Sequence, residues 1–251
     1  MVKEALHPSG LKISFFEKKH EYLVGNERYD SVTSLIKSNF PAFDADKVSE
    51  IVAKKQGRDK KEILAEWEVT RKEAASFGTK FHSMVETILI KKDLEAANHF
   101  AVSEKEKRYL EALKKAVLEI GKSYDFLHVE KIVFSPSLKI AGTIDVILQN
   151  KKTGSLVVAD WKTNKKIDFS GFDKGLGPFK TLENCNFIHY SLQLSAYRHL
   201  LLREGYVEKN QAVNTALLHF ADTGSEILLN KIKPKDLNEP LLVLLGSEEL
   251  V

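Results

Sequence analysis

Two aspartates and a lysine are spaced so that they could build a metal site between two neighbouring strands. Asp145 lies in one strand-like run, and Asp160 and Lys162 end the next run along the chain. If the two runs pair through Asn150 and Ser155 at the intervening turn, the aspartates face each other, since opposed Cβ atoms lie about 5 Å apart. Two carboxylates that close repel each other unless a cation lies between them. Oxygen ligands suit a hard divalent ion, so the spacing predicts a Mg²⁺ or Mn²⁺ site.

Lys162 belongs to the same predicted site. It lies two residues after Asp160, so strand alternation puts its ammonium on the same face as that carboxylate. Residues 156–159 are continuously apolar and predict a strand buried on both faces, where charged groups are costly unless they have a function. The simpler alternative, an ordinary ion pair at a strand end, is favoured by the Asp-x-Lys triplet alone. The opposed Asp145 and the buried strand favour a functional metal site instead.

The elements that must position these residues predict an α/β (α+β) fold with a mixed central sheet. The runs that indicate it are strands from Phe126 to Phe134, Lys139 to Gln149 and Leu156 to Lys162, a helix from Tyr190 to Arg203, and strands from Thr215 to Phe220 and Glu226 to Leu229. Residues 168–178 hold three glycines and predict a mobile loop. No G-x-x-x-x-G-K-[ST] spacing occurs, which argues against nucleotide hydrolysis at a phosphate-binding loop.

The first part of the chain predicts a small hairpin and a short helix. β-forming residues run from Leu11 to Phe16 and from Glu21 to Val24, separated by a polar turn. Ser31 is placed to begin a helix, which should stop before Pro41 because the residue ahead of a proline avoids the helical region.

A helical cap is predicted between the hairpin and the sheet. Residues 44–90 have a helical pattern and many charges, with breaks expected near Gly57 and Gly78. Ser103 and Glu106 form a capping-box signature, and the apolar stripe after them predicts a helix that ends near position 121.

Bulk composition predicts one globular unit. The 251 residues suffice for a single domain, divided into a hairpin and cap (1–122), a core sheet with its helix (123–235) and a tail (236–251). The net charge of +3 permits nucleic-acid binding without demonstrating it. Cys185 is the only cysteine, which excludes an intrachain disulfide and a cysteine-ligated iron–sulfur cluster. No signal peptide or apolar run of ~20 residues is visible, so we expect a cytoplasmic protein of a bacterium or phage-infected cell.

Several motifs, taken together, resemble the RecB-like branch of the PD-(D/E)XK nuclease superfamily. Its G-x-x-D and (D/E)-x-K core is matched by Gly142-Thr143-Ile144-Asp145 and Asp160-Trp161-Lys162. Its two helix motifs, G-T-x-x-H and Q-x-x-x-Y, are matched by Gly78-Thr79-Lys80-Phe81-His82 and by Gln193-Leu194-Ser195-Ala196-Tyr197. Asp30-Ser31-Val32-Thr33 is similar to an S-V-T segment of mitochondrial genome maintenance exonucleases and their phage-encoded relatives. The motifs occur in the family's order, with Asp160 where many relatives carry glutamate.

The resemblance implies a restriction-endonuclease-like core and a role for each matching residue. The metal ligands that it implies are His82, Asp145, Asp160 and the backbone carbonyl of Trp161. The catalytic residues that it implies are Lys162, Asp160, Asp145, Gln193 and Tyr197. Lys162 would either steer the attacking water or stabilise charge in the transition state. Weaker candidates, chosen from their positions alone, are Glu86, Glu130 and Thr163.

The resemblance further implies a DNA nuclease that uses one or two Mg²⁺ or Mn²⁺ ions and no iron–sulfur cluster. We expect an exonuclease acting on single-stranded DNA ends in replication, repair or recombination, with the charged helices as a lid over the strand. Three aromatic residues of the lid region could stack on bases or belong to the core: Trp67, Phe77 and Phe81. The alternatives are a structure-specific or restriction-like endonuclease, a phosphohydrolase of small nucleotides, and a non-catalytic nucleic-acid-binding recombination partner.

Overall fold

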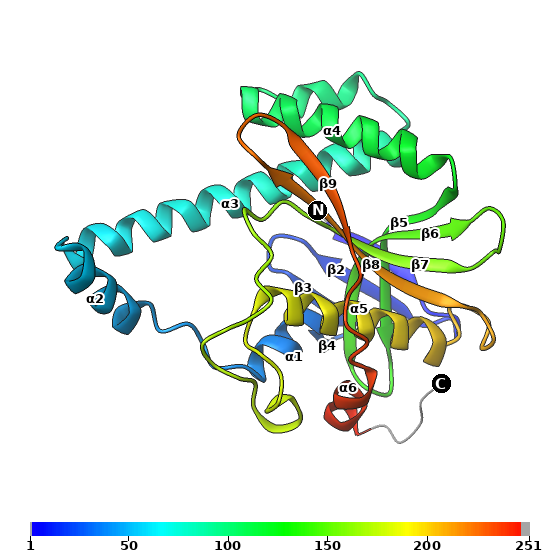
Figure 1. Cartoon of the computed structure of the whole chain (residues 1–251). Helices are drawn as coiled ribbons and strands as arrows, with labels where there is room; N and C mark the ends of the chain where they lie inside the picture. Colours follow the sequence, from blue (N-terminus) through cyan, green and yellow to red (C-terminus); the bar gives the residue numbers. More distant parts are fainter. Residues whose placement is uncertain (1, 247–251) are drawn as a thin grey trace.

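A nine-stranded mixed sheet forms the centre of the protein, whose residues 2–246 are described by this computed structural model (Figure 1). The strands are β1 (Val2–Leu6), β2 (Lys12–Phe16), β3 (Glu21–Val24), β4 (Glu27–Ser31), β5 (Tyr124–Ser135), β6 (Ile140–Asn150), β7 (Leu156–Lys162), β8 (Val213–Asp222) and β9 (Ile227–Ile232). They follow the order β1-β2-β3-β4-β6-β7-β8-β9, and β5 pairs with β6. Parallel pairs, β4 with β6 and β7 with β8, occur beside antiparallel ones. The predicted α/β fold with a mixed central sheet is therefore confirmed.

Helices cover the sheet on both faces. They are α1 (Val32–Ser38), α2 (Ala45–Gln56), α3 (Lys60–Leu89), α4 (Glu104–Gly121), α5 (Asn186–Arg203) and α6 (Asn238–Leu245), with short 3-10 turns at Ala96–Phe100 and Gly177–Phe179. One apolar core joins α1, α5 and α6 to the sheet, and Val158 of β7 points into it. A second joins α3 and α4 to the sheet, and Ala159 and Trp161 of β7 point into it. A third lies between β2–β4 and the β5–β6 pair. The apolar residues of β7 are thus buried on both faces of the sheet, as the sequence predicts.

The predicted break at Gly78 is wrong, because α3 runs through it without interruption. A glycine inside a helix costs only about 1 kcal/mol relative to alanine. Phe77 and Phe81, on either side of it, are buried in the core against α4, and this packing holds the helix together. The predicted break at Gly57 is confirmed, since this residue ends α2 in the left-handed conformation with φ of 65°.

Two strands were not predicted from the sequence: β1, at the edge of the sheet, and β4, which lies between β3 and β6. None of the side chains of β1 is fully buried, so it lacks the apolar alternation of a half-buried strand. In β4 only Tyr29 and Ser31 are buried, and charged residues fill the other positions. The hairpin of β2 and β3, the helix begun by Ser31 and the capping box of α4 are confirmed.

An arm of the molecule is formed by α2 and the first part of α3, residues 44–76. Figure 1 shows this arm extending away from the sheet, while the second half of α3 returns to it. Within residues 2–246, none of the helices combines the length and apolar character that crossing a bilayer requires. Of the predicted tail, residues 238–245 form α6, and positions 247–251 lie outside the described residues.

Candidate active site

The site lies where β6 and β7 end their pairing. The Asn150 amide donates to the Ser155 carbonyl at 2.8 Å, so the predicted register across the turn is confirmed. The ladder runs as far as Val146 and Ala159, one residue short of the two aspartates. Beyond it, the Trp161 amide donates to Asp145 Oδ2 at 2.9 Å. Where the backbone pairing ends, the Asp145 carboxylate accepts this hydrogen bond in place of a backbone carbonyl. The bond holds the Asp145 side chain beside β7.

Asp160 and Lys162 form a buried ion pair. Lys162 Nζ lies 2.6 Å from Asp160 Oδ2, and the two side chains are 18% and 3% exposed. Burial raises the pKa of Asp160 to about 6, with Lys162 opposing the shift and Asp145 adding to it. Burial also lowers the pKa of Lys162, but the nearby Asp160 and Asp145 carboxylates outweigh it, so the net shift is upward. The ammonium stays charged and lies 4.5 Å from the centre of the Tyr190 ring.

His82 reaches the site from α3, on the other side of Asp145 from Lys162. Its Nε2 lies 3.8 Å from Asp145 Oδ2, and its Nδ1 lies 3.4 Å from Glu130 Oε1. One ligand atom from each of these three residues lies within 4.8 Å of the others. Burial lowers the pKa of His82, but the carboxylates of Asp145 and Glu130 raise it to about 9. The imidazole thus meets a negative potential that would equally attract a divalent cation.

Glu130 has a more central place than its position in the sequence suggested. It lies in β5 between the pairs Val129–Val146 and Lys131–Ile144, so register places it beside Asp145. Its φ of 52° is left-handed, a conformation that costs a side-chain-bearing residue about 1–2 kcal/mol. Such strain persists where the surrounding structure requires a particular side-chain direction. The β5–β6 register could have indicated this residue, but its left-handed backbone could not be read from the sequence.

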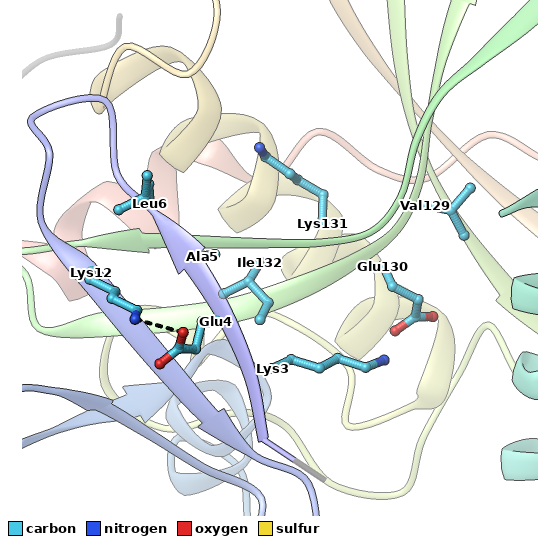
Figure 2. A pocket seen from close by; sticks show the side chains of 9 residues that line it. All are labelled: Lys3, Glu4, Ala5, Leu6, Lys12, Val129, Glu130, Lys131 and Ile132. Atoms are coloured by element: carbon cyan, nitrogen blue, oxygen red, sulfur yellow. Dashed lines mark ion pairs between the residues drawn. The ribbon is translucent and has the colours of Figure 1, made fainter.

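A groove of about 830 Å³ between β1 and β5 adjoins the site at Glu130 (Figure 2). Figure 2 shows Lys3 extending from β1 towards Glu130. The Lys3 ammonium lies 3.2 Å from a Glu17 carboxylate oxygen and 3.8 Å from one of Glu86. Glu86, a weaker candidate, therefore lies at the rim of the site and pairs with Lys3. Thr163 is half-buried just past β7, and within residues 2–246 no hydrogen bond of its side chain joins it to the site.

Gln193 and Tyr197 face the site from α5, one helical turn apart. The Gln193 side-chain amide donates to Asp160 Oδ1 at 3.5 Å and to the Tyr197 hydroxyl at 3.3 Å. Tyr197 is buried and also packs on Gly142, where an added Cβ would lie 2.5 Å from a Tyr197 ring carbon. A glycine three residues before Asp145 is therefore needed for α5 to pack closely on β6.

The aromatic residues suggested for base stacking are placed differently. Phe77 and Phe81 are buried in the core between α3, α4 and the sheet, so the suggestion is wrong for these two. Trp67 is half-buried on the arm, with its ring centre 5.8 Å from that of Phe43.

The donor set of the site suits a hard divalent cation. Carboxylates of Asp145 and Glu130 and the imidazole of His82 converge, and Asp160 lies beyond Asp145 on the side of Lys162. Carboxylate oxygens are the preferred ligands of Mg²⁺ and Mn²⁺, and Mn²⁺ accepts the single imidazole more readily than Mg²⁺ does. Lys162 then adds a fixed positive charge next to the ligand set.

Comparison with known families identifies a superfamily. The model of the PD-(D/E)XK nuclease superfamily matches residues 54–241, a range that includes all the site residues described above except Lys3 and Glu17. No curated protein matches the chain significantly.

Proposed function

The chain belongs to the PD-(D/E)XK nuclease superfamily, a group of metal-dependent nucleases, and we propose that it is a Mg²⁺- or Mn²⁺-dependent deoxyribonuclease of the RecB-like branch. The observation that carries the proposal is the convergence of Asp145, Asp160, Lys162 and His82 at the divergence of β6 and β7. These residues come from three separate elements and meet at one point.

We assign the metal ligands to Asp145, Asp160, His82 and the backbone carbonyl of Trp161, and we add Glu130. Asp145 would take the middle place in this ligand set, because β6 lies between β5, which carries Glu130, and β7, which carries Asp160. When bound, the ion lowers the pKa of its water and neutralises charge on the phosphate.

The protein's own groups do the remaining work. Lys162 is charged, fixed by Asp160 on one side and Tyr190 on the other, and it orients the water or stabilises charge on the pentacovalent phosphorus. Gln193 holds Asp160 in place through its amide, and Tyr197 holds Gln193. Both residues of α5 are therefore positioning residues.

The proposed substrate is single-stranded DNA with a free end, degraded as an exonuclease does in replication, repair or recombination. The arm leads directly into the part of α3 that carries His82, so a strand at the metal site passes beside it. A flexible single strand can bend around such an obstacle, whereas duplex DNA is stiff over ~150 base pairs.

The test is incubation of the protein with end-labelled linear single strands, blunt duplex and closed single-stranded circles, with and without Mg²⁺. We expect metal-dependent loss of linear single strands, slow loss of duplex and intact circles. Rapid cutting of circles would overturn the exonuclease assignment in favour of an endonuclease. Metal-independent binding without cleavage of any substrate would favour a non-catalytic binding protein, and hydrolysis of free nucleotides alone would favour a phosphohydrolase.

A further inference from the structure

The exposed aromatic side chains of the protein are confined to two segments. Within the described residues 2–246, which include every phenylalanine, tyrosine and tryptophan of the chain, only Phe43, Phe169 and Phe172 are exposed, at 69%, 60% and 109% of full accessibility. Phe43 precedes α2, and the other two lie in the loop of residues 163–185 between β7 and α5. Exposed apolar groups that gather in one region mark binding surfaces more often than scattered ones do.

These two segments are held together by hydrogen bonds. The Leu176 amide donates to the Asn39 carbonyl at 2.8 Å, and the Asn184 side chain donates to the Pro41 carbonyl at 3.0 Å. Phe169 packs against α5, where its ring centre lies 4.6 Å from that of Phe187. The aromatic surface of Phe43, Phe169 and Phe172 therefore rests on an ordered part of the fold.

The loop also starts inside the candidate active site. It follows Lys162 directly, and its Asn164 side chain donates to the Tyr190 hydroxyl at 2.7 Å. Tyr190 in turn lies under the Lys162 ammonium. The loop therefore connects the candidate active site at Lys162 with the segment that carries Phe169 and Phe172.

Charge on the loop fits a nucleic-acid strand. The loop of residues 163–185 holds four lysines and three carboxylates: Lys165, Lys166, Lys174, Lys180, Asp168, Asp173 and Glu183. Lys166 pairs with Asp168 and Lys174 with Glu183, so Lys165 and Lys180 carry the positive charge that is not paired among the described residues. Single-stranded nucleic acids are bound by positive charge along the backbone together with aromatic side chains that stack on bases. Both features occur here within one loop beside the metal ligands.

We propose that the aromatic surface of Phe43, Phe169 and Phe172 binds single-stranded DNA next to the cleavage point by stacking on its bases. The inference rests on the proposed nuclease function, which it deepens by naming the groups that select an unpaired strand. In duplex DNA the bases are already stacked on each other, so the same side chains gain little. Phe172, fully exposed and free of ring contacts among the described residues, is the best position to test.

The experiment compares Phe172→Ala with Phe172→Trp and with Leu118→Ala, a control at an apolar residue of α4 that is 71% exposed. All carry Asp160→Asn, so that strands survive the binding measurement. Each is titrated with a short single-stranded oligonucleotide and with a strand of the same length whose sugars lack bases. We expect Phe172→Ala to weaken binding of the normal strand by about fivefold to 150-fold, the range for loss of one stacked base.

Three further results are expected if bases stack on Phe172. Binding of the baseless strand is unchanged by Phe172→Ala. Phe172→Trp binds the normal strand as the Asp160→Asn parent does, with quenched tryptophan fluorescence, and Leu118→Ala has no effect. Equal affinities of Phe172→Ala and its Asp160→Asn parent for the normal strand would overturn the inference. So would a concentration-dependent dimer that Phe172→Ala abolishes while DNA binding is unaltered, because the surface would then bind a second copy of the chain.

Failure of the nuclease assignment can be told apart from failure of this inference. Absence of cleavage by the protein without Asp160→Asn tests the former alone. The difference between normal and baseless strands tests the latter alone.

Discussion

Lys162 and Asp160 carry opposite charges 2.6 Å apart in a site where Asp160 is almost inaccessible to water. Removing one partner of a buried pair leaves the other charge uncompensated, which costs about 3–5 kcal/mol. Lys162→Met should therefore lower the unfolding free energy by about that amount in chemical denaturation. It should also slow DNA cleavage by at least about 100-fold, through loss of charge stabilisation. Near-wild-type cleavage by Lys162→Met would show that the site is wrongly assigned.

A matched control is Asp125→Asn, at an exposed carboxylate of β5 that pairs with Lys151. A surface pair of this kind contributes about 0–1 kcal/mol. Stability and cleavage should both stay close to the wild-type values.

His82 and Glu130 are expected to act as two of several metal ligands. His82→Ala and Glu130→Gln should each raise the Mg²⁺ concentration needed for half-maximal cleavage by at least about tenfold. Mn²⁺, which accepts mixed nitrogen and oxygen ligands readily, should partly restore the activity of His82→Ala. His99→Ala, at an exposed histidine after α3, should leave the metal titration unchanged. An unaltered titration of His82→Ala would make this histidine a structural residue of α3.

The residues of the site differ in how far sequence could identify them. Asp145, Asp160 and Lys162 depend on a short turn and on strand alternation, both local, and the ladder and ion pair bear out the predicted register and the shared face of Asp160 and Lys162. Glu130 depends on the distant pairing of β5 with β6 and on a left-handed backbone, so its proximity to His82 emerged only in three dimensions.

At the scale of elements, α4 is anchored by its capping box and by α3. Glu106 accepts from the Ser103 and Val102 amides and pairs with Lys80 of α3 at 2.7 Å. The hydrogen bond from Lys80 and those of the cap lower the pKa of Glu106 to about 2. A carboxylate whose pKa is lowered by folding stabilises the fold fully at pH values above its ordinary pKa, which is near 4.5 for Glu106. This contribution is lost as the pH falls towards 2.

Glu106→Gln should consequently lower the melting temperature at pH 7, and the difference from wild type should shrink at pH 3. Glu104→Gln provides the comparison, since Glu104 lies in the same helical turn but is exposed and contacts only its neighbour Lys107 among the described residues. A difference for Glu106→Gln that is independent of pH would contradict the assigned ion pair.

Element boundaries follow sequence where local signals fix them and depart from it elsewhere. Ser31 and Ser103 begin their helices as predicted, because a capping hydroxyl acts on the amides of its own first turn. Strand β1 owes its place to β2, with which it pairs along its whole length, and its own side chains give no apolar pattern. The position of β1 is therefore set by its pairing with β2, which no local sequence pattern indicates.

At the scale of the whole molecule, the arm is the feature that bears on substrate choice. Replacing residues 45–74 by a flexible glycine–serine linker removes only two buried side chains, Ser49 and Ile63, and keeps Phe77 and the helix that carries His82. The variant should still cleave linear single strands with the same metal requirement, while closed circles become substrates. Assays on linear and circular DNA, side by side, measure this. Loss of all cleavage in a folded variant would mean that the arm contributes to the metal site itself.

The scarcity of buried side chains in the arm also means that the molecule does not have one uniform stability. Local opening costs little where few apolar contacts are lost, and it approaches the global unfolding free energy in a core strand such as β7. The arm can therefore fray and reform on its own, many times within the lifetime of one folded molecule. The ligands of the metal, held by β5, β6, β7 and the packed half of α3, keep their places meanwhile. The protein thus combines a rigid candidate active site with an arm that opens locally at little cost.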